Sequence, residues 1–183
     1  MPIDNRKDVL LLLLYAPGPM GNQAEPITGR TRLQKLLFLL GKQHSLDRLV
    51  PNYYEYRPYK FGPFSKDLVE DLEFLENLGF VQEGRTGTSS LAEDEELEYS
   101  YDFLTEEDTS EMPCASCVPC FALTDKGRAF VEAQLLPYLS STDAKAIDTV
   151  KAKLGAIPLV NLLRYVYKHY PEAASETELT HLT

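Results

Sequence analysis

One stretch constrains the fold more than any other, namely residues 57–81, RPYKFGPFSKDLVEDLEFLENLGFV. Its first part, Lys60-Phe61-Gly62-Pro63, predicts a tight turn, because glycine and proline supply the backbone angles that turns need. Ser65 then offers an N-cap for a helix, Gly79 would end that helix as a C′ glycine, and Phe80-Val81 starts a strand. Apolar residues between the two caps recur every three or four positions and so share one helical face. They are Phe64, Leu68, Leu72, Leu75 and Leu78.

A second strand and another capped helix follow later in the chain. Phe121-Ala-Leu-Thr-Asp-Lys-Gly predicts a short strand and then a helix with Thr124 as its N-cap. The predicted elements follow the order helix, helix, strand, long loop, strand and helix. This is the order of a winged helix-turn-helix. We therefore predict a mainly α fold with a small β-wing, arranged as a winged-helix-like domain with C-terminal helical additions. The expected organisation is a domain over 1–140 with an acidic, cysteine-containing wing insertion at 84–119, a helical pair at 141–171 packed on it, and a tail at 172–183.

Apolar periodicity predicts further helices in the rest of the chain. They cover about residues 5–15, 30–43, 125–139, 142–154 and 158–170. The apolar run Leu10–Leu14 is too short to span a membrane, which takes about 20 residues, so we interpret it as part of a core helix and expect no membrane partner. The three cysteines form no even framework of pairs, which favours a cytoplasmic protein.

Positive charge gathers in one part of the sequence. Residues 28–66 carry eight basic and two acidic residues, a balance that suits an electrostatic partner such as a protein or a nucleic acid backbone. The helix predicted at 65–78 carries five carboxylates, which argues against ordinary reading of the major groove. A third interpretation pairs the basic residues of the 30–43 helix with these carboxylates on a solvated face. The candidate binding residues are Arg30, Arg32, Lys35, Lys42, Arg57, Lys60 and Lys66.

Negative charge gathers in another part. Residues 91–111 contain ten acidic and no basic residues, and so account for the whole formal net charge of −10. This loop would mimic DNA or occupy a basic surface, cover residues 28–66 of its own chain (the basic pole) as a gate, or form a solvated wing insertion. The sequence leaves these three interpretations open.

The cysteines are closely spaced. Cys114, Cys117 and Cys120 form a CxxCxxC pattern, and such spacing lets thiolates converge on one metal ion. A zinc ion or an iron–sulfur cluster would need a fourth ligand, and the chain has no fourth cysteine, so a site shared across a homodimer is one way to complete it. The alternative is a reducible loop that forms a transient disulfide.

Signatures of catalysis are missing from the sequence. It contains no GxGxxG, GxxxxGK[ST], HExxH or GxSxG pattern, and its three histidines are scattered. We therefore expect no catalytic residues and no enzyme.

Three segments together resemble the YwgA-like and Panacea-type proteins. Residues 31–40, TRLQKLLFLL, are similar to the early LQKLLYL helix of that family. Residues 59–68, YKFGPFSKDL, are similar to its YxxGPxSxxL turn and helix, and residues 162–171, LLRYVYKHYP, to its YVYxKYP ending. The acidic, cysteine-containing insertion departs from the pattern. The resemblance implies a compact, mainly helical fold with winged-helix character and, for Panacea-type members, neutralisation of a toxin by protein contact; it supplies no catalytic residues.

These observations lead to one leading hypothesis and two alternatives. The leading hypothesis is a non-enzymatic regulatory adaptor that binds a protein partner, such as a toxin or a defence effector, through the winged-helix surface around residues 30–66. The first alternative is a DNA-binding transcriptional regulator whose acidic loop gates a basic face. The second alternative is a metal or redox sensor that acts through CxxCxxC.

Overall fold

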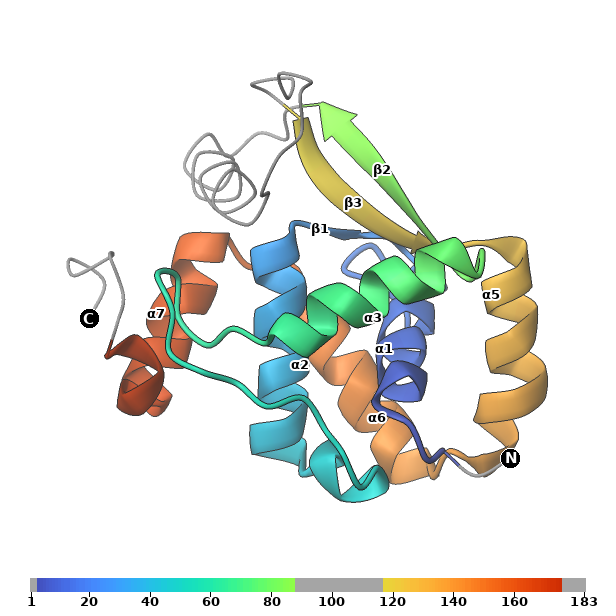
Figure 1. The fold of residues 1–183 in the computed structure, drawn as a ribbon, viewed down its shortest axis with the longest axis horizontal. Coiled ribbons are helices and arrows are strands. Elements are labelled where there is room, and N and C mark those ends of the chain that lie inside the picture. The colour runs from blue at the N-terminus through green and yellow to red at the C-terminus, as the bar shows by residue number, and fades with distance from the viewer. Residues whose placement is uncertain (1–2, 88–116, 176–183) are drawn as a thin grey trace.

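The computed structural model describes residues 3–87 and 117–175 (Figure 1). The protein is mainly helical with one small antiparallel sheet, as predicted. Its principal elements are α1 (Arg6–Tyr15), β1 (Ile27–Thr28), α2 (Arg30–His44), α3 (Lys66–Asn77), β2 (Val81–Gly87), β3 (Cys117–Leu123), α5 (Asp125–Phe130), α6 (Ser141–Thr149) and α7 (Leu159–His169). Single turns of 3₁₀- or π-helix extend several of them, including Val131–Leu135 after α5 and Val150–Leu154 after α6.

The three strands are ordered β1-β3-β2 in the sheet. β2 and β3 form a hairpin whose register runs from Val81↔Leu123 to Gly87↔Cys117, and β1 pairs with the other edge of β3. Residues 84–87 and 117–119 therefore belong to the hairpin, and the prediction that the wing insertion covers 84–119 is wrong at both ends. The acidic loop 91–111 and Cys114 lie outside the described residues.

Both ends of α3 are held by neighbouring parts of the chain. Ser65 is the N-cap residue, as predicted, but its hydroxyl makes no capping bond; instead its backbone N–H donates to Gln34 Oε1 of α2 at 3.0 Å. At the other end Gly79 has a φ of +71°. Its N–H donates to the carbonyl of Glu76, and the N–H of Phe80 donates to that of Leu75, which is the Schellman arrangement that ends many helices.

The predicted core helix α1 lies inside the fold. Residues 9–14 are each at most 2% exposed, because β3, the π-helical turn after α5, and α6 all pack around this helix. A helix surrounded on every side is expected to be apolar all round, which explains the run of leucines. Within the described ranges no helix is long and apolar enough to cross a membrane.

α7 packs against a different side of α2 from the rest of the fold (Figure 1). Leu159, Leu162 and Val166 form a second cluster there with Phe38 and Leu39 of α2. The tail predicted at 172–183 begins too early, because residues 171–174 form a 3₁₀ turn whose Ala173, 5% exposed, belongs to this cluster. Residues 176–183 lie outside the described ranges.

Candidate functional site: helix α3 and the groove beside the sheet

Two of the predicted binding residues make contacts within the protein. Arg30 Nη2 lies 2.8 Å from Glu83 Oε2 on β2, and its guanidinium lies 6.0 Å from the centre of the Phe121 ring. Arg32 Nη1 donates to the backbone carbonyls of Gly155 and Ile157, at 3.2 and 2.6 Å. Both arginines therefore connect α2 to distant segments of the chain.

Lys35 was predicted to lie on the binding surface, and this is wrong. Its side chain is 0% exposed, and Nζ donates to the carbonyl of Pro63 at 3.1 Å. The adjacent Gly62 has a φ of +84°, and a Cβ on it would lie 2.9 Å from the Tyr167 ring. Lys35 therefore supports the turn before α3 and cannot contact a partner at the surface.

This turn is also where the three segments that carry the family resemblance meet. Gln34 of the first segment exchanges two hydrogen bonds with the backbone of Ser65 in the second, at 2.9 and 3.0 Å. Tyr167 of the third segment closes the space above Gly62. The three patterns thus have a structural role in common, which is to fix the position at which α3 begins.

The remaining predicted cations do not gather at one place. Lys42 and Lys66 are exposed, and Lys66 lies 3.6 Å from Glu70 on its own helix. Arg57 is exposed and Lys60 is half-buried, both in the connector between α2 and α3. Because α2 rises about 1.5 Å per residue, Lys42 lies about 18 Å along the helix from Arg30. The basic pole of the sequence is therefore distributed over several parts of the fold.

The carboxylates on one flank of α3 pair with α1, and the suggested pairing with the basic residues of α2 is wrong. Asp71 is 4% exposed and lies 2.7 Å from Arg6 Nε and 2.9 Å from Lys7 Nζ. Arg6 also reaches Asp67 at 2.7 Å. Burial and the nearby Asp71 carboxylate raise the pKa of Tyr54 well above its usual value. This network holds α3 against α1.

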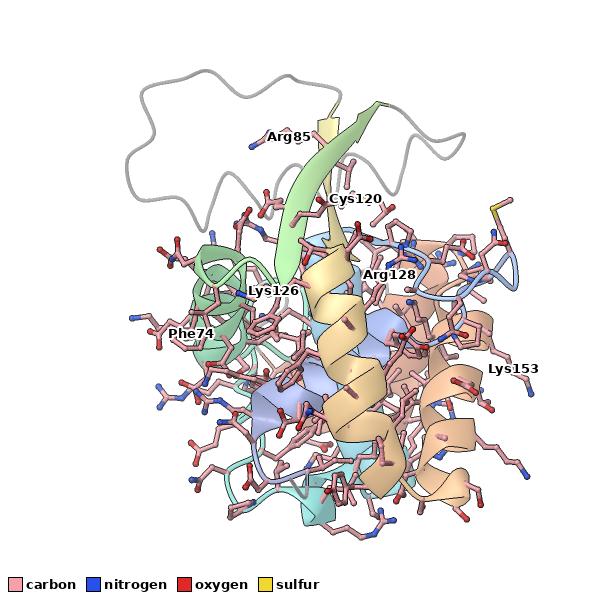
Figure 2. All side chains as sticks on the ribbon, turned by 90° about the vertical axis from the view of Figure 1, so that its right-hand side faces the viewer. Phe74, Arg85, Cys120, Lys126, Arg128 and Lys153 are labelled. Atoms are coloured by element: carbon pink, nitrogen blue, oxygen red, sulfur yellow. The ribbon has the colours of Figure 1, made fainter. Side chains whose placement is uncertain are left out.

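The outer face of α3 remains exposed, and it is acidic with apolar residues beside the acids. Glu70, Glu73 and Glu76 are exposed, and Glu73 has no ion-pair partner among the described residues. Phe74 is 48% and Leu78 43% exposed, and Figure 2 shows Phe74 at the outer edge of the molecule. Lys7 Nζ lies 5.2 Å from the centre of the Phe74 ring, and Lys126 Nζ donates to the carbonyl of Leu78. Exposed aromatic residues are enriched at protein-binding surfaces.

A groove of about 170 Å³ lies between α3 and the sheet. It is lined by Arg30, Val69, Leu72, Glu73, Glu76, Val81, Glu83 and Phe121. Figure 1 shows α3 crossing below the β2–β3 hairpin, so that both elements border the groove. Three carboxylates and one guanidinium leave two negative charges in excess at its walls.

The described part of the structure offers little support for the predicted metal site at the cysteines. Cys117 is the first residue of β3, and Cys120 follows three residues later. Along an extended strand this spacing separates their backbones by about 10 Å, so the predicted reducible loop is wrong for Cys117 and Cys120, which both lie in β3. Burial raises the pKa of the Cys120 thiol, which keeps it protonated and weakly reactive. No group of three or more metal-ligating side chains occurs in the described part of the chain.

Sequence reasoning missed a second buried lysine. Lys151 is 1% exposed, and Nζ donates to the carbonyls of Leu14 and Ala16 at the end of α1, both at 2.7 Å. Burial lowers its pKa to about 7. The signal in the sequence is its position among Ile147, Val150 and Leu154, which places a lysine within the apolar stripe of the helix.

No protein-family model matches the chain, and the search of the curated proteins found no match either. The resemblance to YwgA-like and Panacea-type proteins therefore stays a prediction.

Proposed function

We propose that the protein is a winged-helix-like, non-enzymatic adaptor or regulator that binds a protein partner through the outer face of α3. The winged-helix assignment is supported by the order α1-β1-α2-α3-β2-β3 and by the sheet order β1-β3-β2. In a winged helix the element in the position of α3 faces the ligand. The observation that carries the proposal is that this helix exposes Glu70, Glu73 and Glu76 together with Phe74 and Leu78.

This surface supports protein binding better than DNA binding. The phosphates of a duplex would meet a row of carboxylates, whereas affinity for DNA comes mainly from lysine and arginine. Of the cations that would have countered this charge, Lys35 is buried, Arg32 donates to backbone carbonyls and Arg30 pairs with Glu83. The binding surface we propose is thus the acidic face of α3, in place of the basic pole expected from the sequence.

The same proposal includes the more specific predictions for cellular location, kind of partner and oligomeric state. A cytoplasmic location, a toxin or defence effector as the partner, and a homodimer are all compatible with an adaptor of this kind. The first alternative, a DNA-binding regulator with an acidic gate, is an outcome that the DNA-binding measurement below would detect. The second alternative, a metal or redox sensor, would be supported by zinc or iron in an elemental analysis of protein purified without chelator.

Site-specific photocrosslinking tests the proposal. A photoreactive phenylalanine analogue replaces Phe74 in cells of the native host, and a matched protein carries it in place of Tyr138, which is 57% exposed and follows α5. We expect a discrete crosslinked protein at position 74 that is absent at position 138. Absence of any crosslinked protein at position 74, or crosslinks there to DNA, would contradict the proposal.

A DNA-binding measurement completes the test. Fluorescence anisotropy with a mixed-sequence duplex at about 20 mM salt, where phosphate attraction is barely screened, should detect no binding. Replacing residues 91–111 with a short glycine–serine linker should not change this result. Binding by the shortened protein alone would favour the gated DNA regulator instead.

A further inference from the structure

The groove between α3 and the sheet has the size of a site for one side chain. Its volume of about 170 Å³ is well below the roughly 300–1,000 Å³ of pockets that enclose drug-sized ligands. Val69 and Leu72 of α3 supply apolar lining on one side, and Val81 and Phe121 of the sheet supply it on the other. A long side chain with methylene groups would bury its stem against these residues.

The charged residues in the groove lining would favour a cation. Glu73 and Glu76 come from α3, and Glu83 comes from β2. Arg30 neutralises Glu83 at 2.8 Å, and one Glu76 oxygen accepts from the N–H of Glu83 at 3.3 Å. The carboxylate of Glu73 and the second oxygen of Glu76 remain as acceptors. Glu73 and Glu76 are three residues apart on α3, so they are neighbours on the helix surface, and carboxylate oxygens are good acceptors for the N–H groups of a guanidinium.

The rest of the chain favours an occupant from another molecule. Residues 88–116 and 176–183 contain twelve acidic residues and no lysine or arginine, so they supply no long cationic side chain to the groove. The formal net charge of −10 also steers basic partners toward the protein.

We propose that this groove binds an arginine side chain presented by the partner protein, with the stem packed between Val69 and Phe121 and the guanidinium paired with Glu73 and Glu76. This inference rests on the proposed function, because it names the chemistry by which α3 would recognise its partner. The exposed Phe74 and Leu78 would then contact apolar residues around that arginine.

A pair of peptides tests the groove directly. N-acetyl-Ala-Ala-Arg-Ala-Ala-amide is titrated into the isotope-labelled full chain, and the same peptide with citrulline, the uncharged isostere of arginine, is the control ligand. We expect the arginine peptide to shift the backbone amide signals of Glu76, Val81 and Glu83, and to bind at least about tenfold more tightly than the citrulline peptide. Equal binding of the two peptides, or shifts scattered over other acidic surfaces, would overturn the inference.

Charge-neutralising variants separate the groove from the general acidity of α3. Glu73→Gln combined with Glu76→Gln should weaken arginine-peptide binding about tenfold or more. Glu70→Gln changes the charge of the same helix outside the groove lining, beside Lys66, and should weaken it less than about twofold. All these residues are exposed, so the variants are expected to fold. Equal losses in the two variants would refute a specific site.

The same variants distinguish failure of the groove from failure of the proposed function. If the Phe74 crosslink forms equally in the Glu73→Gln, Glu76→Gln protein, α3 binds a partner without the groove and only the present inference is wrong. If the arginine peptide binds the groove but no protein crosslinks at Phe74, the groove is a cation site and the adaptor function is wrong. A crosslink to a second copy of the chain would identify self-association, which overturns the inference of a different partner protein.

Discussion

The buried Lys151 leads us to predict how the free energy of unfolding depends on pH. The sign and size of this dependence follow from the surroundings of Nζ. Nζ is buried against the end of α1 and donates to the carbonyls of Leu14 and Ala16. These acceptors, together with Glu25 and Asp148, favour the ammonium form, while burial and Arg128 oppose it, and burial is the largest effect. The pKa in the folded protein is therefore lowered from 10.5 to about 7.

The lowered pKa links stability to pH. Between pH 7 and 10.5 the unfolded chain holds a proton on Lys151 that the folded protein has partly released, so the free energy of unfolding must rise with pH. The slope approaches 1.4 kcal/mol per pH unit in the middle of this window, which amounts to about 3 kcal/mol between pH 7 and 9.5. Below about pH 7 both states are protonated and the dependence disappears.

The assay is urea denaturation at several pH values from 6 to 9.5. Higher values are avoided because burial raises the pKa of Tyr53 and Tyr54, and their ionisation would then favour unfolding. Lys151→Met removes the titrating group, and Lys153→Met is the matched control, because Lys153 is exposed two residues away (Figure 2). The control should keep the rise of about 3 kcal/mol, and Lys151→Met should lose it. Parallel profiles of the two variants would refute the reasoning.

Three further predictions concern the attachment of α3, each read from the free energy of unfolding in urea. Gln34→Ala leaves the buried backbone N–H and C=O of Ser65 without their partners and should cost about 2–5 kcal/mol; a loss below about 1 kcal/mol would contradict it. Gly62→Ala adds a methyl group 2.9 Å from a tyrosine ring at a φ of +84°. It should lower the free energy of unfolding more than Gly21→Ala, where φ is +81° and nothing lies within 4 Å. Equal losses in the two variants would exclude the steric effect. Asp71→Asn weakens two ion pairs with α1 and should cost about 2–3 kcal/mol, whereas an unchanged midpoint would show that the network contributes nothing.

Local signals in the sequence were sufficient to predict most helices and the β2–β3 hairpin. Gly79 ends α3 and Thr124 caps α5, because both roles depend on hydrogen bonds with backbone groups only three residues away. β1 was missed because a strand of two residues exists only through its pairing with β3. The burial of Lys35 and Lys151 was missed for a related reason, since the carbonyls that receive their hydrogen bonds lie far away in the sequence.

The candidate site was predictable only in part. The carboxylates of α3 are visible in the sequence, and so is their conflict with DNA binding. The groove is not, because its lining combines Arg30, Glu83 and Phe121 with α3, and only the tertiary fold brings these residues together. The apparent basic pole was misleading because proximity in sequence does not separate cations that bind carbonyls inside the protein from cations that face solvent.

The contacts around α3 hold the helix in place before a partner protein binds. Gln34 fixes its first turn, Asp71 ties its flank to α1, and Gly79 ends it in a Schellman arrangement. Lys126 donates to the carbonyl of Leu78 at 2.6 Å. A helix held at both ends and along one flank loses little conformational freedom when a partner binds, so a larger share of the contact energy is left for affinity. For that reason the charge and shape of the outer face, above all of Glu73 beside the groove, should decide which partner α3 accepts.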